Sequence, residues 1–318
     1  QDTLSLTAAA SRRAKGVPTG AYGADFNDRG HAYIDAQAYV DLAYARRLSA
    51  ASELSGRAFV ADYSFSLPAR YGSPVRNYDD AHGSWYGAEI KLISALDARN
   101  KLVAGFEHQR NRMQNQRNYD ASPYTLYLND RRHGERSGLF VQDEFQWTSE
   151  LRLTVGGRYD LVTGQSGQFS PRLGAVYRLS DQTVWRAQYG SSFRAPNVYE
   201  SYYSLPGVQS ASSNLRPETI KTWEAGLEHY LDSRTRLLAS AYVYRLNKLI
   251  DQVTETTSGL LQYTNIGRTS ARGVELGLVR VEHAQVDDGL AVLRVLGQHL
   301  LVRRSHAGVV VHPALDVA

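Results

Sequence analysis

Arginine and tyrosine are the residues of this chain whose chemistry points to a ligand. The sequence of 318 residues holds 21 Tyr, 36 Lys and Arg combined, and no Cys. Guanidinium groups pair with anionic oxygens, and both side-chain types stack on flat groups, so together they suit a large anionic ligand with apolar or aromatic parts. The candidate ligand-binding residues fall in stretches that we expect to form exposed loops: Tyr22, Tyr78, Arg117, Tyr119, Tyr124, Tyr127, Arg131, Arg132, Arg194, Tyr202 and Tyr203.

A second explanation is open for each of these residues. Arginines can meet the phosphates of lipopolysaccharide, and tyrosines accumulate where a protein crosses a membrane–water boundary. The formal net charge is +4, and no block of basic residues interrupts the sequence. A nucleic-acid partner is therefore not expected, whereas the second explanation would make outer-membrane lipid and lipopolysaccharide the partners of these residues.

Neither a metal centre nor a catalytic site is expected. The absence of Cys excludes thiolate ligands and disulfides, and the nine His residues form neither an HExxH nor a His-x-His pattern. No GxSxG motif is present, and Asp25, Asp28 and His31 are the one cluster of acid and imidazole. Asp79–Asp80 and Asp120 are expected on loops, where they could hold Ca²⁺, although carboxylates at loop tips are usually only solvated. We therefore predict a protein that is not an enzyme and has no cofactor.

The elements that would position the loops are long β-strands. Between residues 32 and 46 the even positions are apolar, from Ile34 to Tyr44, whereas odd positions such as Asp35 and Asp41 are polar. This alternation is longer than the strands of most soluble sheets. It recurs in about thirteen segments, over 2–9, 32–46, 53–65, 84–95, 101–112, 136–147, 150–161, 169–179, 183–193, 219–230, 236–247, 262–278 and 290–302. A bulge is expected near Gly267 or Gly273.

The connections between these segments alternate between short and long. Short turns are predicted at 49–52, 97–100, 148–150, 180–182 and 232–234, and long polar loops at 11–31, 66–83, 113–134, 194–218 and 250–261. Outer-membrane barrels have short periplasmic turns and long extracellular loops, whereas a soluble all-β protein, the alternative, has no reason for this asymmetry. No uncharged apolar stretch of 18 residues is present, which excludes a helical span. The predicted fold class is all-β, an antiparallel transmembrane β-barrel.

The barrel interpretation assigns each strand a lipid face and a lumen face. Apolar positions should face lipid, and the charged positions that alternate with them should face the lumen. The lipid-facing set is Leu151, Leu153, Val155, Trp185, Ala187, Trp223 and Leu227, and the lumen-facing set is Arg152, Arg158, Arg186, Glu224 and Glu228.

Several phrases, in order along the chain, resemble the TonB-dependent outer-membrane receptors. They are "SGLFVQDEFQW", "SPRLGAVYRL", "YGSSFRAPNVYESYY", "SNLRPETIKTWEAGLEHYL", "AYVYRLNKLI" and "YTNIGRTSARGVELGL". The resemblance implies that residues 1–278 are barrel wall in the outer membrane of a Gram-negative-type envelope. It implies active uptake of a scarce, large ligand, foremost a ferric siderophore or else cobalamin, with the TonB energy-coupling complex as partner.

The chain also departs from the family pattern. The N-terminal plug, the TonB-contacting segment and the closing strands are expected to be absent, which leaves a partial barrel. A passive porin-like barrel and a non-functional truncated fragment therefore remain alternatives. Residues 279–318 contain none of the 33 Tyr, Phe and Trp residues, although barrel strands need aromatic residues at both membrane interfaces. We predict that this atypical tail arises from a reading-frame shift; a genuine C-terminal domain is the alternative, although forty residues without Cys or aromatic residues offer little material for a core.

Overall fold

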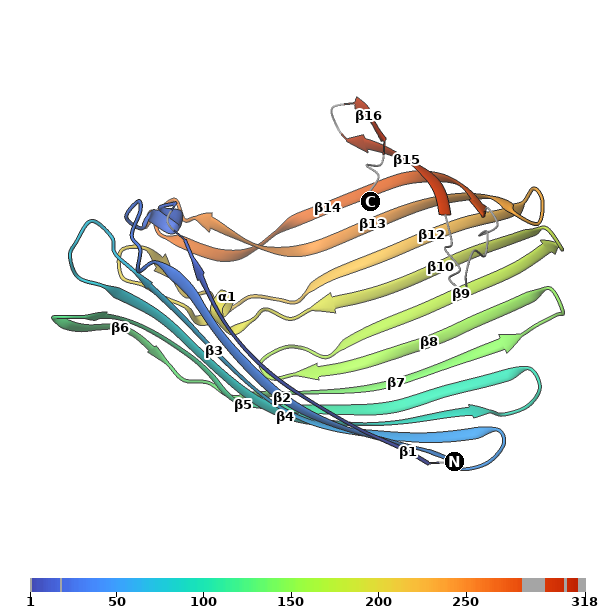
Figure 1. Cartoon of the computed structure of the whole chain (residues 1–318), viewed down its shortest axis with the longest axis horizontal. Helices are drawn as coiled ribbons and strands as arrows, with labels where there is room; N and C mark the ends of the chain where they lie inside the picture. Colours follow the sequence, from blue (N-terminus) through green and yellow to red (C-terminus); the bar gives the residue numbers. More distant parts are fainter. Residues whose placement is uncertain (1, 18, 282–294, 306–307, 314–318) are drawn as a thin grey trace, which may run out of the picture.

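The computed structural model describes residues 2–17, 19–281, 295–305 and 308–313. Fourteen of its strands lie side by side in one antiparallel sheet that starts with β1 and ends with β16 (Figure 1). Along this path the strands are β1 (Asp2–Gly16), β2 (Ala32–Arg47), β3 (Ser52–Ala69), β4 (Asn77–Ala95), β5 (Asn100–Ala121), β7 (Gly134–Gln146), β8 (Leu151–Val162), β9 (Gln168–Ser180), β10 (Thr183–Arg194), β12 (Glu218–Tyr230), β13 (Thr235–Thr254), β14 (Leu261–Val281), β15 (Val295–Ser305) and β16 (Gly308–Pro313). The short β6 (Tyr124–Asp130) pairs with β5, and β11 (Gln209–Ser210) pairs with β14.

The sheet is a curved, open wall rather than a closed cylinder (Figure 1). The predicted all-β antiparallel class is confirmed. One end of the sheet carries the short turns, and the other carries the long connections; we call the latter the long-loop end. In the described part of the chain, no helix is both long and apolar enough to cross a membrane.

Several strands continue further toward the long-loop end than the apolar alternation predicts. β1 runs to Gly16, β3 to Ala69 and β13 to Thr254, and β5 has 22 residues where about ten would cross a bilayer. The predicted loops 11–31, 66–83, 113–134 and 250–261 are therefore too long. Backbone ladders need only paired N–H and C=O groups, so they persist where side chains on both faces are polar.

The alternation places apolar and charged side chains on opposite faces, as predicted. Cross-strand partners share a face, and the register aligns Leu151 with Tyr177, Tyr177 with Trp185, and Trp185 with Leu227. Large side chains of this outer face are exposed, including Val155 at 56% and Leu139 at 63%. An exposed apolar band of this kind is what a barrel presents to lipid.

The opposite, inner face carries a network of ion pairs. Arg158 contacts Asp160 at 2.7 Å and Glu107 at 3.1 Å, and Arg186 contacts Glu228 at 3.0 Å. Leu153 and Arg158 lie an odd number of residues apart in one continuous strand, and they therefore face opposite ways. The predicted lipid and lumen faces are confirmed for this strand.

Two details of the ladder differ from expectation. The register between β13 and β14 shows no shift over its described length, so the bulge expected near Gly267 or Gly273 is wrong; Lys248, opposite Gly267, instead takes a φ of 56°. The register shifts between β4 and β5 at Ser84/Trp85, where Arg112 is the extra residue.

Beyond Leu278, β14 continues to Val281, and β15 overlaps the predicted strand 290–302, whose first residues lie outside the described part. The frame shift stays a prediction.

Candidate functional site

The loop from residue 195 to 217 folds back against the inner face at the long-loop end, and it carries α1 (Val198–Tyr202) (Figure 1). Pro196 lacks a backbone N–H and ends the ladder of β10. Asn197 caps α1, because its side chain accepts from the Glu200 N–H at 2.9 Å while the Glu200 carboxylate accepts from the Asn197 N–H at 2.9 Å. This reciprocal capping box starts a helix of only five residues where the chain leaves the sheet.

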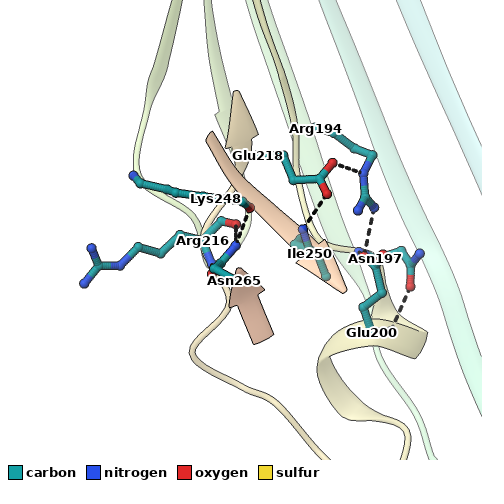
Figure 2. Close-up of polar contacts among 8 residues, drawn as sticks. All are labelled: Arg194, Asn197, Glu200, Arg216, Glu218, Lys248, Ile250 and Asn265. Carbon is teal, nitrogen blue, oxygen red and sulfur yellow. Dashed lines mark hydrogen bonds and ion pairs between the residues drawn. The ribbon is translucent and has the colours of Figure 1, made fainter. Parts of the chain in front are cut away.

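Arg194 fixes this loop to the sheet. Its Nε donates to Glu218 at 2.6 Å and its Nη1 to Glu200 at 2.9 Å (Figure 2). The second oxygen of Glu218 accepts from the Ile250 N–H at 2.6 Å. One guanidinium thus joins the end of β10, the start of β12 and the first turn of α1. A ligand at Arg194 would have to compete with two carboxylates.

A second attachment runs through Asn265 of β14. Its amide accepts from the Arg216 N–H at 2.8 Å and donates to the carbonyls of Arg216 and Lys248 at 2.9 and 2.7 Å. In Figure 2 the side chains of Arg216 and Lys248 point to the side away from Arg194. Both line a cavity of about 670 Å³, with Ser213 on its wall.

A third attachment buries Tyr203 against β4 and β5. Its hydroxyl donates to Asp79 at 2.6 Å and accepts from Asn118 at 3.3 Å, and Asn118 also donates to Asp79 at 2.7 Å. Tyr203 is 6% exposed and Asn118 is 1% exposed. Burial, and next the charge of Asp79, raise the pKa of the Tyr203 phenol well above its usual value of 10. The Gln116 amide adds a bond to the Val198 carbonyl at 3.0 Å.

Arg132 and Tyr202 meet where the β5–β6 hairpin approaches α1. The guanidinium carbon lies 3.3 Å from the ring centroid, which is a stacked cation–π contact. Arg132 also donates from its Nε to both oxygens of Asp130, at 3.0 and 2.9 Å. Among the described residues, Arg132 donates to a side chain through Nε alone, so its two terminal amino groups are left for another acceptor while the Asp130 bonds and the Tyr202 ring hold the guanidinium plane in place.

Other members of the predicted set lie on the outer face instead. Tyr78 stacks on Tyr119 with centroids 5.3 Å apart, and Arg117 lies 4.0 Å from the Tyr119 ring. Tyr78 has the same parity in β4 as the exposed Tyr86, so this stack shares a face with the apolar band. Tyr124 packs beside Tyr119 at 5.8 Å, and Arg131 lines a groove on this same face.

The predicted residues therefore form two groups rather than one site. The inner group holds Arg132, Arg194, Tyr202 and Tyr203. Of the remaining two, Tyr127 donates to Asp120 at 2.7 Å, and Tyr22 belongs to the 3-10 turn η1 (Ala21–Gly23). The split arises because residues 77–80 and 116–120 pair in one ladder, in which successive side chains point to opposite faces of the sheet. Residues of a loop would not be separated in this way.

Sequence reasoning missed Asp79, Asn118 and Gln116, which hold the 195–217 loop. Asp79–Asp80 and Asp120 were expected on loops, but they lie in β4 and β5, so that expectation is wrong. No alternation in the sequence marks these stretches as strands, since residues 77–83 read Asn-Tyr-Asp-Asp-Ala-His-Gly without a regular apolar face. Because they are neighbours in a strand, Asp79 and Asp80 point to opposite faces.

The acid and imidazole cluster has a structural explanation for both of its acidic members, and Asp25 accepts from the Gly72 N–H at 2.6 Å. Asp28 accepts from Arg76 at 3.1 and 3.2 Å, which fixes the loop before β2. His31 is 1% exposed, and neither ring nitrogen has a partner in the described region. Over that same region no three His, Asp or Glu residues are arranged to hold a metal ion.

Relatives in sequence are outer-membrane transporters and receptors. A family model described as TonB dependent receptor-like, beta-barrel matches residues 2–297. The chain is 30% identical over 131 residues to the vitamin B12 transporter BtuB of Vibrio cholerae, covering 41% of this chain and 19% of that protein. It is 29% identical over 120 residues to the iron-regulated outer membrane virulence protein of the same species, covering 36% and 18%.

Solved structures share the fold at low sequence identity. The siderophore receptor PirA from Acinetobacter baumannii gives a TM-score of 0.68 at 13% identity, covering 96% of this chain and 54% of that one. The copper transporter OprC gives 0.66 at 17% identity, covering 86% and 47%. The chain thus spans about half the length of these structures, and its matched part about a fifth of the sequence relatives. A family model that matches nearly the whole chain, on a sheet with a lipid face, a lumen face and long loops at one end, shows that this outer-membrane protein belongs to the TonB-dependent receptors and forms part of their β-barrel.

Proposed function

We propose that the receptor takes up a ferric chelate of the siderophore type across the outer membrane, with energy supplied through TonB. The observation that carries this proposal is the stacked pair of Arg132 and Tyr202 on the lumen side of the extracellular, long-loop end. An iron chelate of this type is large, rich in anionic oxygens and often aromatic. A guanidinium with free terminal amino groups above a phenol ring offers hydrogen bonds, charge and a stacking surface together.

The position of this pair supports the proposal. Arg132 follows β6 at the base of the β5–β6 hairpin, where its carbonyl accepts from the Gln114 N–H at 2.9 Å, and Tyr202 ends α1, so the pair joins two segments at the long-loop end. Tyr203 and Arg194 anchor the same loop from either side, at Asp79 and at Glu218. We assign Tyr203 and Arg194 a positioning role and Arg132 and Tyr202 the contact with ligand.

Cobalamin is the second candidate, favoured by the match to the vitamin B12 transporter BtuB. Its rim of amides would use tyrosine hydroxyl groups more than guanidinium charge. The two candidates therefore differ in how strongly binding should depend on Arg132 and on salt.

The test compares two adjacent arginines in the receptor as encoded by its full gene, purified in lipid nanodiscs. Arg132→Gln should weaken an anionic ferric chelate by roughly tenfold or more, because a charge-assisted hydrogen bond is lost. The effect should grow at low salt and should be small for a neutral chelate. Arg131→Gln is the matched control, since Arg131 lines the outer-face groove.

Equal affinities of the wild type and Arg132→Gln for every chelate would exclude this contact. Tight cobalamin binding that ignores both arginines would favour the second candidate. Uptake that continues without TonB, together with solute-size-dependent swelling of liposomes, would instead identify a passive pore.

A further inference from the structure

A carboxylate lies on the lipid-facing side of the wall, among apolar side chains. Asp143 of β7 is aligned with Leu102 of β5 and with Val155 of β8. Cross-strand partners share a face, and Val155 belongs to the exposed apolar band. Along β7 the neighbours of Asp143 on this face are Val141 and Phe145, because side chains alternate along a strand. The four nearest positions around this acid are therefore apolar.

One oxygen of this carboxylate is buried without a partner. Within the part of the chain that the structure describes, Oδ1 of Asp143 accepts no hydrogen bond. The next residue shows the contrast, because Glu144 points to the inner face and contacts Arg152 at 3.3 Å. Glu107, also on the inner face, contacts Arg158 at 3.1 Å. A charged group without a partner is costly in an apolar setting, so a cation from the surroundings would stabilise Asp143.

Another acid on the outer face does have a partner within the fold. Asp62 has the same parity in β3 as the exposed Val60, and its carboxylate is hydrogen-bonded to the ring of His82 at 2.9 Å. The wall can thus serve an outward-facing acid where a polar residue lies nearby on the next strand. The positions opposite Asp143 are apolar instead.

Asp143 lies near the short-turn, periplasmic end of β7. The strand ends at Gln146, three residues later, which is about 10 Å along the strand or about 8 Å along the membrane normal at a tilt of roughly 40°. At this end the rings of Phe145 and Trp147 meet edge to face with centroids 5.7 Å apart, and Trp147 is 61% exposed. Exposed aromatic residues mark the membrane–water interface of barrels. The carboxylate is therefore within reach of headgroups in the periplasmic leaflet.

We infer that Asp143, with Phe145 and Trp147 beside it, binds the primary ammonium headgroup of a phospholipid in the periplasmic leaflet. A carboxylate accepts short, charge-assisted hydrogen bonds from an ammonium group, and aromatic rings attract a cation to their faces. The acyl chains of the same lipid would pack on the apolar band, at Val141 and Val155. A free amine could use the carboxylate and the rings, but only an acylated one would also use the band.

The experiment counts the phospholipids that stay bound to the full-length receptor in native mass spectrometry. Phosphatidylethanolamine and phosphatidylglycerol with the same acyl chains are offered together, so that only the headgroup differs. The wild type should retain phosphatidylethanolamine in preference. Asp143→Asn keeps the shape of the side chain and removes its charge, and it should lower this preference roughly tenfold, because charge-assisted hydrogen bonds are lost.

Glu135→Gln is the matched control. Glu135 lies on the same face of β7 as Asp143, eight residues away at the long-loop end, so this variant removes an equal charge far from the proposed site. It should keep the wild-type preference. Phosphatidylcholine, whose ammonium group cannot donate a hydrogen bond, should bind the wild type more weakly than phosphatidylethanolamine does. A large molar excess of free ethanolamine should not displace the lipid.

Several results would overturn the inference. One is an unchanged preference in Asp143→Asn, folded as judged by its β-sheet circular dichroism, and another is an equal loss in Glu135→Gln. It also fails if phosphatidylglycerol or phosphatidylcholine binds the wild type as tightly as phosphatidylethanolamine, or if free ethanolamine displaces the lipid. Because Arg132 is unchanged throughout, these outcomes are independent of chelate binding.

Discussion

The hydroxyl of Tyr203 should control whether the 195–217 loop stays docked in the lumen. Tyr203→Phe removes one oxygen that donates to Asp79 at 2.6 Å and accepts from Asn118 at 3.3 Å. The ring remains, so its contact with Tyr199 at 4.5 Å is preserved. Asp79 keeps its bond to Asn118 but loses its shortest donor in a half-buried position.

The expected magnitude follows from that loss. A hydrogen bond to a charged group contributes about 1.5–3 kcal/mol, which corresponds to roughly a 10- to 150-fold rise in the undocked population. The other attachments, through Arg194 and Asn265, are untouched, so the sheet itself should not be destabilised. The effect should be confined to the loop and α1.

Amide hydrogen exchange in nanodiscs measures this directly. The amides of Ser201, Tyr203 and Ser212 are bonded to the carbonyls of Asn197, Tyr199 and Ser201, respectively, and should lose protection by the stated factor. Tyr202→Phe is the matched control, because it keeps the ring under Arg132 and removes a hydroxyl with no described partner. Unchanged exchange in Tyr203→Phe, or an equal loss of protection in Tyr202→Phe, would refute the docking role.

Three further predictions concern the membrane face, pH and the tail. Val155→Arg puts a charge on the exposed apolar band and should destabilise the barrel by about 2–4 kcal/mol if it sits near the midplane, whereas Arg172→Leu on the inner face should cost little; equal unfolding midpoints in urea would contradict the face assignment. Because the pKa of Tyr203 is raised in the docked loop, its contribution to docking should be complete below the ordinary tyrosine pKa of about 10 and be lost as pH rises above it. The protection factors of the loop amides, corrected for intrinsic exchange, should therefore be constant from about pH 7 to 9 and fall at higher pH. The same fall in Tyr203→Phe would rule out this explanation. For residues 279–318, translation of the other two frames downstream of the Leu278 codon should give alternating strands that end in an aromatic residue, and two frames without such strands would remove the proposed frame shift.

The strands of the barrel wall were predictable from sequence because alternate residues are apolar where they face lipid and polar where they face the lumen. Val155 and Arg158 had to face opposite ways in a strand that crosses a membrane, and the register bears this out. Replacing Arg158 with Leu should nevertheless be destabilising, although the residue lies on the polar, lumen-facing side of the strand. Its guanidinium holds both Asp160 and Glu107, and this cross-strand partner is invisible without the register.

The site was less predictable because its residues lie where the apolar signal has ended. Tyr78 and Asp79 are neighbours in sequence, yet one stacks on the outer face and the other binds Tyr203 inside. A loop would have allowed both to reach one ligand, whereas a strand separates them. Likewise Arg131 lines the outer-face groove, whereas Arg132 contacts Tyr202. This difference depends on where the β5–β6 hairpin ends and where α1 lies, and neither can be read from the sequence.

The most direct test of the central claim is to locate bound iron at the mouth of the lumen. The chain contains no Cys, so a fluorophore can be attached to a single cysteine at Ser213→Cys in the extracellular loop or at Ser233→Cys in a short periplasmic turn. Paramagnetic ferric iron quenches nearby fluorophores, and the receptor is titrated with a ferric chelate that it binds. We predict saturable quenching at position 213, weakened in Arg132→Gln, and none at position 233. Binding of the chelate without quenching at position 213, or with equal quenching at both positions, would contradict the account.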